Sequence, residues 1–98
     1  MSLPIRFLPE AKAEFDAAAN WYEQHRSRLG VEFIGRIRET LLRIADHPEM
    51  KAVVYKDLRQ SAVQQFPYLV VYRYDGNEIL VVAVFHAARD QTVWQSRA

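Results

Sequence analysis

The first part of the chain repeats apolar and polar positions with a helical period. Pro9 followed by Glu10 predicts a helix start, because proline suits the first helical position and an acidic side chain suits the positive end of the helix dipole. The apolar residues that recur at helical spacing are Ala11, Phe15, Ala18 and Tyr22. We therefore expect a first helix over about residues 9–27.

A second helix is predicted directly after Gly30. This glycine stands where a left-handed residue would end the first helix. The segment that follows carries one apolar stripe, formed by Phe33, Ile37, Leu41, Ile44 and Ala45. Pro48 ends the pattern, because the residue before a proline is displaced from helical backbone angles. We expect an antiparallel helical hairpin whose apolar faces turn toward the rest of the molecule.

The second half of the chain has the composition of β-strands. Segments 53–56 and about 58–65 are plausible strands, and segments 68–74 and 77–85 are strong ones, rich in β-branched and aromatic residues. A short alternating segment at 5–8 adds a first strand. Together these patterns predict an α+β fold of two layers, in which the helical hairpin packs on a small, mainly antiparallel four-stranded sheet in the order β-α-α-β-β-β.

The two strong strands are expected to form a hairpin. Asp75-Gly76 between them is the best two-residue turn in the chain. With these residues at the turn centre, Arg73 faces Glu78 across the strands as a pair of opposite charges. Apolar side chains then lie on both faces of the hairpin, so we expect the helices to cover one face and a partner to have access to the other.

Composition excludes several classes of protein. The 98 residues suit one domain over residues 1–98. Without cysteine, neither disulfides nor thiolate metal sites can form, and the 3 histidines are too scattered for a zinc site. The longest apolar run, residues 79–85, is too short to span a membrane, and the start of the chain lacks the regions of a signal peptide. We expect a cytoplasmic protein with no metal or other cofactor.

The net charge of the chain argues against tight binding of nucleic acid. Its 13 basic and 12 acidic side chains give a net charge of +1. Proteins that bind a nucleic-acid backbone normally show a clear basic excess, because their affinity comes from neutralising phosphates.

Several motifs follow one another in a specific order. They are Leu29-Gly30-Val31-Glu32-Phe33, Asp46-His47-Pro48-Glu49, Phe66-Pro67-Tyr68-Leu69-Val70-Val71-Tyr72-Arg73, and His86-Ala87-Ala88-Arg89-Asp90 with Trp94. In this order and spacing they resemble the RelE/ParE superfamily of bacterial type II toxin-antitoxin modules, also called plasmid stabilisation proteins. The resemblance implies a toxin that a cognate antitoxin neutralises, and it agrees with the predicted fold.

The resemblance leaves two activities open, because one branch cleaves messenger RNA on the ribosome and the ParE-like branch poisons DNA gyrase. Where the ribonuclease branch has basic side chains and a tyrosine, this chain has Gln60, Ala62, Leu69 and Ala87, with Val93 or Trp94 at the tyrosine position. RNA cleavage by 2′-hydroxyl attack needs a base, an acid and cations. We therefore expect a ParE-like toxin that binds a target such as DNA gyrase. The alternatives are a ribosome-dependent endoribonuclease and a non-toxic family member that only binds an antitoxin.

Three residues could carry the ribonuclease alternative. His86 is suited to proton transfer, Arg89 could hold a phosphate, and Arg59 could add a second cation. Each has a plainer interpretation as well. His86 could be hydrogen-bonded to backbone at a strand end, Arg89 could pair with Asp90 or another carboxylate, and Arg59 could face solvent or a partner.

Partner binding has its own candidates, Arg89 and Trp94. Tryptophan is enriched at interface hot spots, and Trp94 lies in a polar tail, whereas Trp21 is expected to pack in or beside the helical hairpin. The antitoxin is expected to bring an acidic, initially disordered segment that folds on the apolar rim of the hairpin or pairs with a sheet edge. The same surface could form a homodimer.

Overall fold

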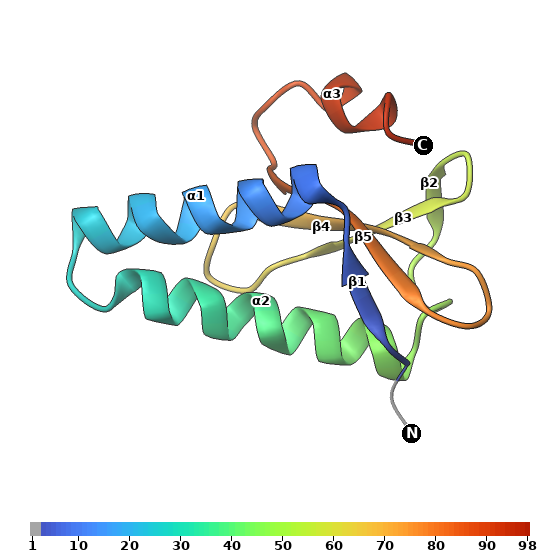
Figure 1. The fold of residues 1–98 in the computed structure, drawn as a ribbon, viewed down its shortest axis with the longest axis horizontal. Helices are drawn as coiled ribbons and strands as arrows, with labels where there is room; N and C mark the ends of the chain where they lie inside the picture. Colours follow the sequence, from blue (N-terminus) through green and yellow to red (C-terminus); the bar gives the residue numbers. More distant parts are fainter. Residues whose placement is uncertain (1–2) are drawn as a thin grey trace.

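The structure is a computed structural model that describes residues 3–98. Its elements are β1 (Ile5–Phe7), α1 (Pro9–His25), α2 (Leu29–Asp46), β2 (Val53–Tyr55), β3 (Leu58–Ala62), β4 (Tyr68–Tyr74), β5 (Ile79–His86) and α3 (Thr92–Gln95). The strands form one sheet, and α1 and α2 lie side by side as a helical hairpin against it (Figure 1). The predicted two-layer α+β fold is confirmed.

The sheet is larger than predicted. It has five strands in the order β1-β5-β4-β3-β2, rather than four. Both β2 and β3 form strands of their own, and they pair antiparallel with each other. β1 pairs with β5 in parallel, so the sheet is mixed. The chain between these two strands includes both long helices and β2, β3 and β4.

The junction between α1 and α2 differs from the prediction. The left-handed residue is Arg28, with φ of 71°, and not Gly30. Gly30 lies in the first turn of α2, where an added Cβ would stand 2.6 Å from the carbonyl oxygen of Ala19. Close approach of the two helices therefore requires glycine here. The Glu23 carboxylate accepts the backbone N–H groups of Arg28 and Gly30, and these bonds, the one from Arg28 first, hold the pKa of Glu23 below its ordinary value.

The turn between β4 and β5 is longer than predicted. Tyr74 lies opposite Ile79, so the four residues between them form the loop. The Asp75 carboxylate accepts the backbone N–H groups of Asn77 and Glu78 at 2.8 and 3.0 Å. These two bonds close the longer loop and lower the pKa of Asp75, the bond from Asn77 having the larger effect.

The longer loop breaks the predicted pair of Arg73 and Glu78, which was wrong. Arg73 donates to the carboxylate of Asp57 at 2.7 Å, and this bond lowers the pKa of Asp57. Glu78 instead pairs with Arg6 of β1, also at 2.7 Å. The parallel strand β1, which the sequence pattern left without a place in the sheet, supplies the partner.

A β-bulge in β5 changes which residues share a face. The pairing shifts between Val71 and Tyr72 of β4, and Val82 is the extra residue of β5. As a result Val81 and Val84 both belong to the cluster that faces the helices. Strict alternation along β5 would place them on opposite faces.

Apolar clusters lie on both faces of the sheet. The larger one fills the space under the helices and includes Phe33, Ile37, Val70, Tyr72 and Val81. The cluster on the other face joins Trp94 of α3 to Leu58, Val71, Val82, Ala83 and Phe85. The face expected to be accessible to a partner is therefore partly covered by the chain's own C-terminal helix, which lies across the sheet from α2 (Figure 1).

Candidate functional site

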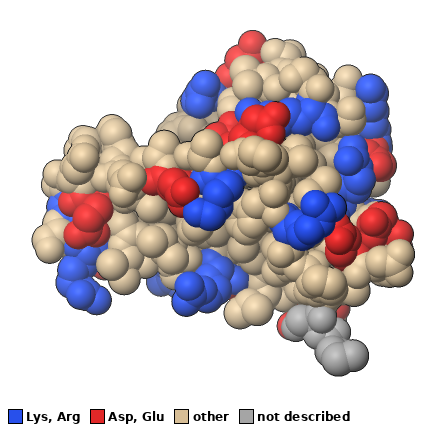
Figure 2. Space-filling model, in the orientation of Figure 1, with Lys and Arg blue, Asp and Glu red and all other residues tan. Residues whose placement is uncertain are grey.

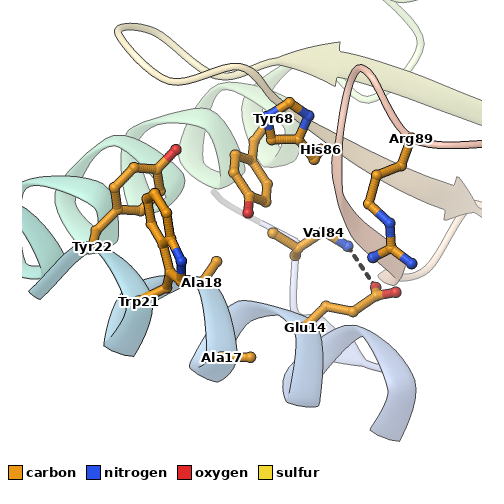
Figure 3. A pocket seen from close by; sticks show the side chains of 9 residues that line it. All are labelled: Glu14, Ala17, Ala18, Trp21, Tyr22, Tyr68, Val84, His86 and Arg89. Atoms are coloured by element: carbon orange, nitrogen blue, oxygen red, sulfur yellow. Dashed lines mark hydrogen bonds between the residues drawn. The ribbon is translucent and has the colours of Figure 1, made fainter. Parts of the chain in front are cut away.

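A cleft of about 400 Å³ lies between α1 and the carboxyl end of β5. Its lining residues are Glu14, Ala17, Ala18, Trp21, Tyr22, Tyr68, Val84, His86 and Arg89. The first four are spaced so that they share one face of α1. Figure 3 shows Trp21 and Tyr22 at one end of the cleft and Arg89 at the other, with Tyr68 and Val84 between them.

Glu14 in the lining of the cleft is held by an ion pair with Arg97. Arg97 donates to both carboxylate oxygens of Glu14, at 3.0 and 2.8 Å, and both side chains are largely buried. Glu14 also accepts the backbone N–H of Val84, and Arg97 donates to the carbonyl of Val82. The pairing of β1 with β5 ends at Val81. The Glu14–Arg97 ion pair therefore satisfies backbone groups on the edge of β5 that β1 does not reach. The hydrogen bond to Glu14 raises the pKa of Arg97.

His86 lies at the end of β5 beside the aromatic wall of the cleft. Its Nδ1 accepts the backbone N–H of Ala88 at 3.1 Å, and its ring packs edge-on against Tyr68 with the centroids 5.3 Å apart. A neutral imidazole in this bond carries its proton on Nε2. The structure thus gives His86 the backbone contact foreseen in its plainer interpretation, and Nε2 is the nitrogen that remains for another contact.

Arg89 stands near the opposite end of the cleft from Trp21. Its guanidinium lies over the ring of Phe85, 4.8 Å from the centroid. It has no part in the ion pairs found within residues 3–98. The Asp90 carboxylate instead accepts the N–H and hydroxyl of Thr92, which lower its pKa. The pairing of Arg89 with Asp90 is therefore not formed.

Comparison with known proteins decides the family. Residues 5–91 match the family model described as the ParE toxin of the type II toxin-antitoxin system parDE. The chain belongs to the ParE toxin family. Its structure is similar to a solved structure of the chromosomal ParDE toxin-antitoxin system from P. aeruginosa, with a TM-score of 0.74 and 16% identity over 87% of this chain and 96% of that one. A search of curated proteins gives no match.

The family match confirms the resemblance seen in the sequence. This chain is a ParE-like toxin of a type II toxin-antitoxin system, and its partner is a cognate antitoxin. The likeness to the P. aeruginosa structure, at its low identity, supports the fold. Neither comparison assigns roles to individual side chains.

Arg59 of the ParE-like toxin lies apart from the other two candidates. It sits in β3, and its guanidinium donates to the carbonyl oxygens of Glu49 and Lys51 in the segment before β2. His86 and Arg89 line the cleft at the end of β5, and Arg59 does not. The structure therefore brings together two of the three residues named for RNA cleavage.

The two tryptophans exchange the places that the sequence predicted for them. Trp94 is 2% exposed, and its indole N–H donates to Gln91 Oε1 at 2.7 Å. Trp21 is 54% exposed and stacks on His25, with the ring centroids 3.6 Å apart. The expectation of a packed Trp21 and an accessible Trp94 is wrong, because α3 folds back and inserts Trp94 into the second apolar cluster.

Sequence reasoning missed the α1 side of the cleft. The signal that could have found it is the run of Glu14, Ala17, Ala18 and Trp21 on one helix face, where two small residues separate a carboxylate from an indole. Two tyrosines line the cleft, Tyr22 from α1 and Tyr68 from β4, and burial is the main cause that raises the pKa of each, so both are neutral at ordinary pH. They can donate hydrogen bonds but are poor bases.

Within residues 3–98 there is no group of three or more side chains placed to hold a metal ion. None of the helices in that range is long and apolar enough to cross a membrane.

Proposed function

We propose that this ParE-like toxin acts by binding and inhibiting a macromolecular target, with DNA gyrase as the first candidate, and not by cleaving RNA. The observation that carries the proposal is the separation of its candidate cations. Arg59 is held by the segment before β2, while Arg89 lies at the cleft beside His86. A phosphodiester-cleaving site needs cations, a base and an acid gathered around one phosphate.

The surface charge supports the same proposal. On the face of the described residues drawn in Figure 2, basic side chains alternate with acidic ones instead of forming one basic patch. Six of the 13 basic side chains form ion pairs in the described part of the chain, as in Arg6 with Glu78 and Arg73 with Asp57. Such a surface favours recognition of a folded protein over a grip on an RNA backbone.

The ribosome-dependent endoribonuclease stays as a second candidate because one observation favours it. His86 and Arg89 line the same cleft, and the His86 ring packs against the ring of Tyr68. In that function His86 Nε2 would move the proton and Arg89 would hold the phosphate. The two functions therefore give opposite expectations for the substitution His86→Ala.

Two assays on the purified toxin separate these functions. One follows supercoiling of relaxed plasmid by gyrase, and the other maps messenger RNA ends by primer extension after translation in vitro. We expect gyrase to be inhibited equally by the wild-type toxin and by His86→Ala, with no cuts at the ribosomal A site. Cuts that disappear in His86→Ala would replace this proposal with the nuclease. Normal growth on expression without antitoxin would instead favour a non-toxic family member.

The antitoxin contact is proposed to use apolar surface that the toxin exposes. The exposed apolar side chains include Val31, Leu42, Met50, Val53 and Val54. The last two lie in β2, which is an edge strand, so an acidic antitoxin segment could pair with its backbone or fold against the helices. Since gyrase and ribosomes lie in the cytoplasm, we propose that compartment. Light scattering of the isolated toxin tests whether the same surface makes a homodimer.

A further inference from the structure

The cleft between α1 and β5 has the size and lining of a binding site. Its volume of about 400 Å³ falls within the range of natural ligand pockets. Ala17 and Ala18 form a low floor, and the rings of Trp21 and Tyr68 rise beside it (Figure 3). Trp21 packs against Tyr22 and His25 but is 54% exposed, and tryptophan is enriched at interface hot spots.

The charges in the cleft do not cancel. Glu14 is already neutralised by Arg97, with both carboxylate oxygens engaged. Arg89 has no carboxylate partner in the ion pairs of the described chain. The cleft therefore presents one guanidinium without a counterion, together with the Nε2 of His86, beside an apolar floor. Its complement is a group with one negative charge attached to an apolar body.

We propose that this cleft is an anchor site for the antitoxin, and that it takes an Asp or Glu side chain carried next to a large apolar side chain. The carboxylate binds Arg89, and the apolar side chain fills the space over Ala17 between Trp21 and Tyr68. The inference rests on the acidic antitoxin segment proposed above and adds the cleft as an anchor point beyond the exposed apolar surface named there. One guanidinium neutralises the single charge of a carboxylate, whereas a phosphate monoester carries close to two negative charges.

A small probe with the same chemistry tests the site. The probe is 3-phenylpropionate, compared with its neutral amide, with acetate and with adenosine monophosphate, each titrated into the full chain and followed by ¹H–¹⁵N NMR. The variants are Arg89→Gln, which removes the cation, and Ala17→Leu, which fills the floor from an exposed position. Arg38→Gln on the exposed surface of α2 is the matched control for loss of charge. Thermal melts confirm that each variant folds.

The expected result is binding of 3-phenylpropionate with shifts at the Trp21 indole and at the amides of Ala88 and Arg89. The amide probe, acetate, and either cleft variant should each weaken binding by about tenfold, which is the size of a lost charge-assisted hydrogen bond or apolar contact. Arg38→Gln should leave it unchanged.

Three results would overturn the inference. They are no binding of 3-phenylpropionate, equal binding of its amide, and binding unaffected by Arg89→Gln. Tighter, Arg89-dependent binding of adenosine monophosphate would also overturn it and would favour a nucleotide ligand. The titration involves neither gyrase nor ribosomes, so its failure is distinct from failure of the proposed function.

Discussion

The two ends of the β4–β5 hairpin treat their charged residues differently. At the turn end, Arg73 binds Asp57, Arg6 binds Glu78, and the Asp75 carboxylate accepts two backbone N–H groups of its own loop. Each of these charges has a partner within the fold. The charges there hold the sheet and the loop in place and leave little for another molecule to bind.

At the other end of the hairpin, one charged side chain has no ion-pair partner within the described residues. Glu14 and Arg97 pair with each other and cover backbone groups of β5. Arg89, a few residues away, packs on Phe85 without a carboxylate and lines an open cleft. A charged residue is therefore evidence for a binding role only when the fold itself supplies no partner of opposite charge for it.

The largest effect is expected at the ion pair between Glu14, which lines the cleft, and Arg97. Glu14→Ala removes the acceptor for the Val84 N–H and leaves the largely buried Arg97 unpaired. We expect a loss of about 2 kcal/mol in the free energy of unfolding, measured with urea. Glu49→Ala, an exposed carboxylate, is the control and should change stability by less than about 0.5 kcal/mol. Equal losses in the two variants would show that the ion pair is not structural.

A smaller effect is expected at the turn end. Arg73→Ala removes the pair with Asp57, whose side chain is well exposed. Exposed pairs contribute little, so we expect a loss of about 0.5 kcal/mol that shrinks further in high salt. The same urea titrations measure it. A loss as large as that of Glu14→Ala would remove the contrast between the two ends.

The smallest effect concerns the loop carboxylate and depends on pH. The backbone N–H groups of Asn77 and Glu78 lower the pKa of Asp75 in the folded chain. A lowered folded pKa stabilises the fold above the unfolded pKa of about 4, and this contribution is lost as the pH falls through the folded value. Asp75→Ala should therefore be less stable than wild type at neutral pH, with the difference shrinking in acid. Thermal melts at several pH values measure this, and a difference that grows in acid would contradict it.

Periodicity alone predicted the arrangement of the helices and most strands. The stripes of α1 and α2 and the β-branched run of β4 and β5 each follow from local spacing. The register of the strands could not be predicted from local spacing, because it depends on contacts between segments that are distant in the sequence. The partner of Glu78 comes from Arg6 at the other end of the chain, and the bulge at Val82 has no marker in the sequence. The prediction that Gly30 ends the first helix was wrong, because glycine is required there by the close contact with the backbone of Ala19 on the neighbouring helix.

The candidate site was predicted in part. His86 and Arg89 were singled out by residue type and by resemblance, and both line the cleft. Trp21 was missed because nothing local distinguishes an exposed tryptophan from a packed one on an amphipathic helix. Trp94 was misplaced because burial in α3 depends on Phe85 and its neighbours on the distant face of the sheet.

The most direct test of this account compares Arg89→Gln with Arg73→Gln, which remove the same charge from opposite ends of one hairpin. Affinity for the purified cognate antitoxin is measured by isothermal titration calorimetry with wild-type toxin and both variants. We predict that Arg89→Gln weakens binding by about tenfold and that Arg73→Gln leaves it unchanged. Weaker binding of Arg73→Gln with Arg89→Gln unaffected would contradict the account.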